Sequence, residues 1–164
     1  MRKWILLLAA VVLISAAEPG GPRAAGSGET PSAPSGLPSP SPDIAPGDVV
    51  RIQLDALRAN DESNQGIAVA FRFASPQNKA STGPLPRFIQ MIKAGPYRLM
   101  LEFEHARYAP IKVEGARATQ GVILVGRREI RSYVFFLERQ SGPTCKGCWM
   151  TEAVMVVPGM GQEV

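Results

Sequence analysis

The stretch Gly95-Pro-Tyr-Arg-Leu-Met-Leu-Glu-Phe-Glu-His-Ala106 divides the chain into two parts with different hydrophobic periodicity. Before Pro96, apolar residues recur about every 3.6 residues, which is typical of amphipathic helices. After it, apolar and polar residues alternate as in a half-buried strand, and His105 shares the parity of Leu99 and Phe103. The stretch therefore predicts helices on its N-terminal side and a sheet on its C-terminal side.

Three helices are predicted before this junction. The first begins at Asp48, which we expect to be its N-cap, and ends near Asn60. The second covers residues 67–74, because Ser75-Pro76 disfavours its continuation. The third follows a Gly-Pro pair and covers most of residues 84–95.

Four strands are predicted after the junction. They cover residues 99–106, 113–125, 131–139 and 148–157, and short turns rich in glycine separate the last three. Short turns favour antiparallel pairing. We therefore expect an α+β fold in which three N-terminal helices pack on a curved, four-stranded antiparallel sheet.

The N-terminal part of the chain predicts export. Residues 1–17 combine a basic start, an apolar run and small residues before a cleavage site, as in a Sec-type bacterial signal peptide. Residues 18–47 are rich in Pro, Gly and Ser, which predicts a disordered linker. The α+β domain then covers residues 48–158, and a flexible tail covers 159–164. We expect a periplasmic or secreted protein, with contact to a membrane only through an uncleaved signal.

The charge of the chain argues against nucleic acid as a partner. The formal net charge is +4, most of the cations are arginines, and no dense run of Lys and Arg is present. A nucleic-acid interface needs a concentrated basic face.

Five short segments resemble one bacterial family. They are residues 48–57 (DVVRIQLDAL), 71–76 (FRFASP), 83–85 (GPL), 136–140 (FLERQ) and 147–150 (GCWM). Through them the chain resembles the family called domain of unknown function 4864, over essentially all of residues 48–157. The order of helices and strands is similar to the cone-shaped nuclear-transport-factor-2-like fold. The domain of unknown function 4864 family has no assigned activity, so the resemblance implies a fold and no catalytic residues.

Cys145-Lys-Gly-Cys148 is the short motif with the widest range of possible chemistry. Such a pair can be a redox dithiol, half of a zinc site or a local disulfide. A redox dithiol usually lies at a helix N-terminus, whereas Gly142-Pro143 precedes this pair and a strand is predicted after it. A zinc site needs two more ligands, and His105 is the only histidine of the chain. We therefore favour a structural disulfide and expect neither a metal nor a cofactor.

Four residues are candidates for contacts with a ligand. His105 is predicted to point into the concave side of the sheet, and Arg107 continues the same face. Arg72 lies between two phenylalanines, where a guanidinium can bind a carboxylate or phosphate. Tyr97 is expected to supply a wall of the cavity between helices and sheet.

These features favour a non-enzymatic extracytoplasmic module. It would bind a small, partly apolar and anionic molecule, or a protein partner. One alternative is a cavity enzyme of the isomerase or dehydratase type with His105 as its base. The other is a structural module that forms a homodimer through its sheet face.

Overall fold

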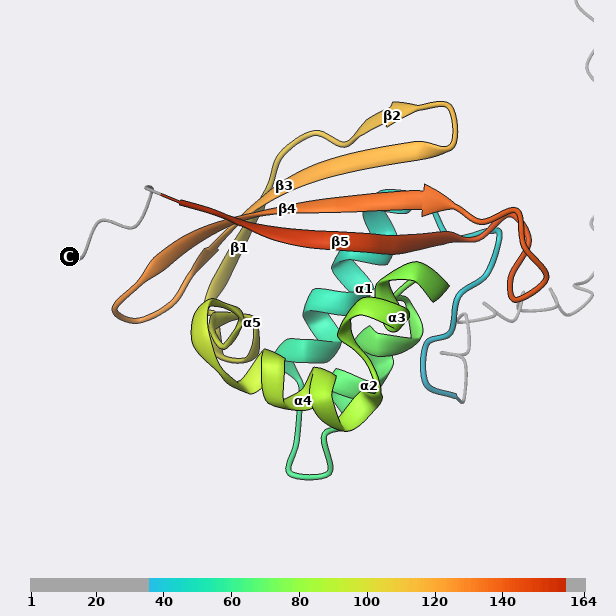
Figure 1. Ribbon diagram of the computed structural model, residues 1–164. Coiled ribbons are helices and arrows are strands. Elements are labelled where there is room, and N and C mark those ends of the chain that lie inside the picture. The colour runs from blue at the N-terminus through green and yellow to red at the C-terminus, as the bar shows by residue number, and fades with distance from the viewer. Residues whose placement is uncertain (1–35, 159–164) are drawn as a thin grey trace, which may run out of the picture. The chain divides into compact units, whose positions relative to one another are not determined.

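The computed structural model describes residues 36–158 (Figure 1). The predicted signal peptide, residues 18–35 of the predicted linker and the predicted tail lie outside the described residues. No helix in the described part combines the length and the apolar character needed to span a bilayer.

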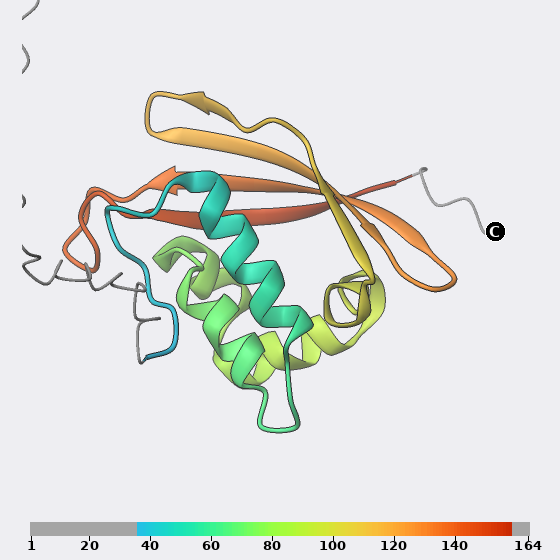
Figure 2. The same cartoon turned by 180° about the vertical axis from the view of Figure 1, so that it is seen from behind.

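The helices precede the sheet, as predicted, and all of them lie on one side of it (Figures 1 and 2). Their order is α1 (Pro46–Arg58), α2 (Gln65–Arg72), α3 (Pro76–Thr82), α4 (Leu85–Lys93), the 3-10 turn η1 (Gly95–Tyr97) and α5 (Leu99–Glu102). The three predicted helices correspond to α1, α2 and α4, whereas α3, η1 and α5 were not predicted. Asp48 lies in the first turn of α1, and the N-cap is Ala45, so the predicted cap is wrong.

The sheet is antiparallel and has five strands instead of the four predicted. They are β1 (His105–Tyr108), β2 (Lys112–Glu114), β3 (Arg117–Val125), β4 (Ile130–Arg139) and β5 (Trp149–Val157). The order is β1-β3-β4-β5, and β2 pairs with the other half of β3. The predicted strand 113–125 is in fact a hairpin of β2 and β3, because Gly115 turns the chain with a φ of 61°.

The predicted strand 99–106 is wrong over its first half. Leu99 and Met100 are adjacent and are 1% and 2% exposed, which strict alternation between two faces does not allow. Residues Leu99–Glu102 instead form a helical turn that buries both side chains. The first strand begins only at His105. A segment of four residues is too short for its periodicity to distinguish a strand from a turn of helix.

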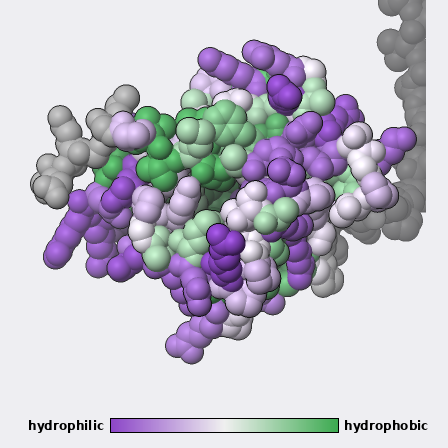
Figure 3. Space-filling view, in the orientation of Figure 1, coloured by the Kyte–Doolittle hydropathy of each residue, from purple (hydrophilic) through white to green (hydrophobic). Residues whose placement is uncertain are grey.

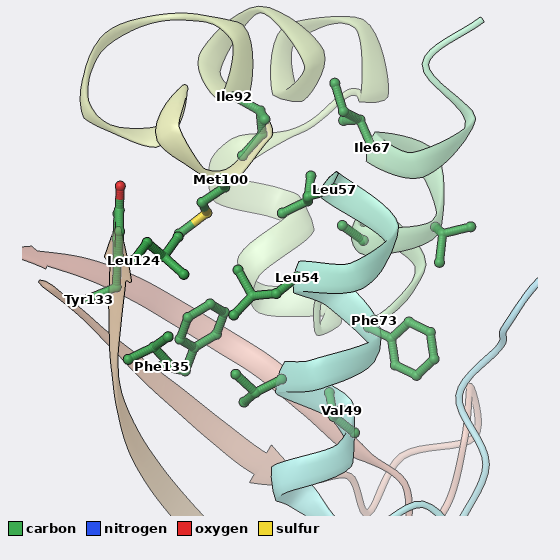
Figure 4. Packing of buried hydrophobic residues seen from close by; sticks show 14 of the residues in the cluster. Val49, Leu54, Leu57, Ile67, Phe73, Ile92, Met100, Leu124, Tyr133 and Phe135 are labelled. Carbon is green, nitrogen blue, oxygen red and sulfur yellow. The ribbon is translucent and has the colours of Figure 1, made fainter. Parts of the chain in front are cut away.

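The core lies between the helices and one face of the sheet. In Figure 4, Leu54 and Leu57 of α1 point toward Leu124 and Phe135 of the sheet. Tyr133 is also buried there, and its hydroxyl donates to the carbonyl oxygen of Pro96 at 2.6 Å. This contact ties η1, which precedes α5, to the middle of β4.

A buried polar network joins the edge strand β5 to three helices. The backbone N–H of Thr151 donates to the carbonyl of Phe73, and the carbonyl of Thr151 accepts from the backbone N–H of Ser75 and from Asn78 Nδ2. The hydroxyl of Thr151 donates to Gln53 Oε1 of α1 at 2.6 Å. Thr151 is 1% exposed, so each of these groups must find its partner inside the protein.

Replacement of Thr151 by valine should therefore destabilise the domain. Thr151→Val leaves the buried Gln53 Oε1 without its donor, which costs about 1–3 kcal/mol. Urea unfolding followed by circular dichroism measures this loss. Thr119→Val is the matched control, because Thr119 is half-buried on the opposite face of the sheet. Equal unfolding free energies for the two variants would contradict a structural role of the Thr151 hydroxyl.

Candidate functional site

A cavity of about 260 Å³ lies between β5 and helices α3 and α4 and reaches inward to α1. Its inner wall is apolar and includes Leu57, Phe88, Ile92 and Phe135. Figure 3 shows a hollow in the surface on this side of the molecule, with hydrophobic residues along its upper edge. Small-molecule sites in proteins are typically concave and apolar in this way.

The polar side chains of the wall are already paired with protein groups. Asn78 Nδ2 donates to the Thr151 carbonyl, and Asn78 Oδ1 accepts from the Thr82 hydroxyl at 3.0 Å. Gln53 Nε2 donates to the carbonyl of Ala70 at 3.0 Å, and Gln53 Oε1 accepts from Thr151. Because these atoms have partners, the wall behaves as a largely apolar surface toward a ligand.

One charged residue, Glu152, is among the residues that line the cavity. It lies at a β-bulge, because Leu137 pairs with Thr151 whereas Phe136 pairs with Ala153. Its carboxylate accepts from Gln140 Nε2 at 3.3 Å. The lining contains no Arg, Lys or His, so nothing in the wall complements a negative charge.

Tyr97 is the predicted ligand residue that does line the cavity. Its hydroxyl donates to the carbonyl of Val154 on β5 at 3.0 Å, which bridges the mouth from η1 to the edge strand. Tyr133 holds the same turn from the other side through Pro96. Burial raises the pKa of Tyr133, so its phenol stays protonated and remains a donor over the physiological pH range.

His105 and Arg107 do not point into the concave side, and this prediction is wrong. Both are exposed, and they pair with Val125 and Ile123 on the face of the sheet away from the helices. The intervening Ala106 and the following Tyr108 pack against the core instead. The error follows from the wrong strand start, because a shift in phase of one residue exchanges the two faces of a strand.

Arg72 is also outside the cavity. It is exposed at the end of α2, and its carbonyl oxygen accepts from Lys79 Nζ at 3.0 Å. Two arginines of α1 lie over aromatic rings instead, Arg51 at 4.5 Å from the Tyr108 ring centre and Arg58 at 5.3 Å from that of Phe103. The structure therefore does not bring the four predicted ligand residues together.

Cys145 and Cys148 form the predicted disulfide, with a Cα–Cα distance of 5.5 Å. Across residues 36–158, no group of three or more His, Cys, Asp or Glu side chains is placed to hold a metal ion. The cysteine pair lies in the loop between β4 and β5 and does not line the cavity.

Sequence reasoning missed most of the cavity wall. One signal was available at Gln53, a polar residue on the same helical face as the apolar Val50 and Leu57. A polar residue on such a face is usually buried with a partner. Asn78 gave no signal, because α3 is a polar helix without an apolar stripe.

Comparison with known proteins identifies a family but assigns no activity. Neither the curated proteins nor the solved structures contain a match. A family model described as domain of unknown function (DUF4864) matches residues 43–164, which include α1 to β5. The chain therefore belongs to the domain of unknown function 4864 family.

Proposed function

We propose that this domain binds a small, uncharged and mainly apolar molecule in the cavity between β5, α3 and α4. The observation that carries the proposal is an apolar cavity whose polar side chains are satisfied by the protein itself. The helices-then-sheet order supports a nuclear-transport-factor-2-like fold, which would place the ligand between helices and sheet. The disulfide is consistent with the periplasmic or secreted location that we also propose.

The size of the cavity restricts the ligand. An apolar cavity of about 150 Å³ is enough to hold benzene. At about 260 Å³, this cavity is large enough for a bicyclic aromatic or a short branched hydrocarbon. It is small compared with sites for drug-sized ligands, which occupy about 300–1,000 Å³.

The distribution of charge favours a neutral ligand over the anionic one expected from the sequence. Arg72 and Arg107 are exposed and are not among the lining residues, and the one charged lining residue is an acid. An anion would lose its hydration in the cavity without gaining a cationic partner, which is costly. His105 is also absent from the lining, so the isomerase or dehydratase hypothesis has no imidazole base in the cavity.

Two probes of similar shape and different charge test this proposal. At neutral pH we expect 2-naphthol, which is uncharged, to bind, and 2-naphthoate, which is an anion, to bind at least about tenfold more weakly. Ligand-observed NMR titration gives both affinities. Met91→Trp should abolish 2-naphthol binding, because the half-buried Met91 lines the cavity and a larger side chain fills it.

Val113→Trp is the matched control for that variant. Val113 is 50% exposed on β2 and is not part of the cavity lining. Binding of 2-naphthol should persist in this variant. Preferential binding of 2-naphthoate, or equal loss in both tryptophan variants, would contradict the proposed site.

A second candidate function is homodimerisation through the sheet face away from the helices. Ile123 and Met155 on this face are 40% and 58% exposed, and contact with a second copy would remove their apolar surface from water. In a two-fold dimer through this face, both side chains would pack against the same surface of the second copy.

Sedimentation velocity tests this second candidate. The unmodified protein should sediment as a dimer, and Ile123→Glu should sediment as a monomer, because it places a carboxylate inside the interface. Val113→Glu is the control on the same sheet, since Val113 pairs with Ala118 on the helix side. A monomeric unmodified protein, or dissociation of both variants, would contradict an interface centred on Ile123.

A further inference from the structure

Val154 on the edge strand β5 presents both of its backbone polar groups to the mouth of the cavity. Its carbonyl accepts from the Tyr97 hydroxyl at 3.0 Å, and both residues line the cavity. In a strand, the N–H and the C=O of one residue point to the same side. The Val154 N–H therefore faces the same space as the carbonyl that Tyr97 occupies.

The register of β5 against β4 leads to the same orientation of Val154. Thr151 uses its backbone groups outward, because they bond to the turn between α2 and α3. Thr151 lies opposite Leu137 and Val154 lies opposite Phe135, which are two positions apart on β4. Pairs in an antiparallel ladder alternate between bonding to each other and bonding away, so positions two apart bond in the same direction. The backbone groups of Val154 thus also point away from β4.

The two groups of Val154 differ in whether they have a partner. The carbonyl is bonded to Tyr97, whereas no acceptor for the N–H is found within residues 36–158. When no ligand is bound, water can accept from this N–H. A purely apolar ligand would displace the water and leave the N–H without an acceptor, which weakens its binding. A ligand with an oxygen at this place would restore the hydrogen bond.

We propose that the cavity selects apolar molecules that carry one uncharged oxygen acceptor, such as a ketone, and that this oxygen accepts from the Val154 N–H. This selection depends on the function proposed above, because it needs a ligand in the same cavity. The apolar part of the ligand lies against α4, and its oxygen lies at β5 beside Tyr97. Because the Tyr97 hydroxyl already occupies the Val154 carbonyl, the edge of β5 offers the ligand a donor at this point.

NMR of the full chain with two matched probes tests the hydrogen bond. 1-Tetralone and tetralin share one bicyclic frame, but tetralin has a methylene group where 1-tetralone has its carbonyl. Saturation with 1-tetralone should move the Val154 amide proton downfield and slow its exchange with water at least about tenfold. Tetralin should not move it downfield, because it supplies no acceptor. Val156 is the internal control, because its N–H also points away from β4 and it is not part of the cavity lining.

The cavity and the hydrogen bond can fail separately in this experiment. If neither probe shifts the resonances of Leu57 and Phe88 on the inner wall, no ligand enters and the proposed function itself is wrong. If both probes shift them and the Val154 amide proton responds alike to both, the cavity binds and only the hydrogen bond to Val154 is wrong.

Proline variants test the same group by removing the N–H. Proline is tolerated on an edge strand where the N–H faces outward. Val154→Pro should lower the affinity for 1-tetralone at least about fivefold relative to that for tetralin, as measured by ligand-observed NMR titration. Val156→Pro removes the next outward N–H, beyond the cavity lining, and should leave the ratio of the two affinities unchanged.

Binding of tetralin shows whether the cavity of each proline variant is intact. A Val154→Pro protein that binds tetralin normally and keeps the ratio of the unmodified protein would overturn the proposal. If Val154→Pro does not bind tetralin, the amide measurement on the unmodified protein decides.

Discussion

The edge of strand β5 at Thr151 imposes the constraint on which the rest of the structure depends. The backbone N–H and C=O groups on the outer side of an edge strand have no neighbouring strand to bond to. At a buried position, water cannot supply the missing hydrogen bonds either. Phe73, Ser75 and Asn78 supply the missing partners. The turn between α2 and α3 is thereby held against the sheet, and the side chain of Thr151 adds α1 to the same point through Gln53.

The cavity follows from how this edge is covered. Protein groups bond to β5 at Thr151 and, through the Tyr97 hydroxyl, at Val154. Between these two contacts lies the cavity, which α4 lines with apolar side chains and α3 lines with the polar Asn78, Ser81 and Thr82. Apart from Glu152, the charged residues of the sheet lie elsewhere, on its far face and at its ends. Binding of an apolar molecule and binding of a second copy would therefore use opposite faces of one sheet.

The long periodic elements could be predicted and the short ones could not. Helices α1 and α4 carry apolar stripes, and β4 is rich in aromatic and β-branched residues, so their type was predicted correctly. Helix α3 has no apolar stripe, because it is held by Ser75 at its N-terminus and by Asn78 bonding to a strand 73 positions away. Helix α5 has only four residues, Leu99–Glu102, which is too short for a helical period to be recognised. Local periodicity contains no information about such distant partners.

The sequence by itself determined the α+β class, the family and the cysteine pair, because these depend on periodicity, on short motifs and on spacing along the chain. Only the tertiary structure decided which residues line the cavity. The first strand begins at His105, and this start turns His105 and Arg107 outward while η1 carries Tyr97 to the mouth. The side chains of a strand alternate between its faces, so their orientation depends on where pairing begins, and pairing is decided by strands far away in the sequence.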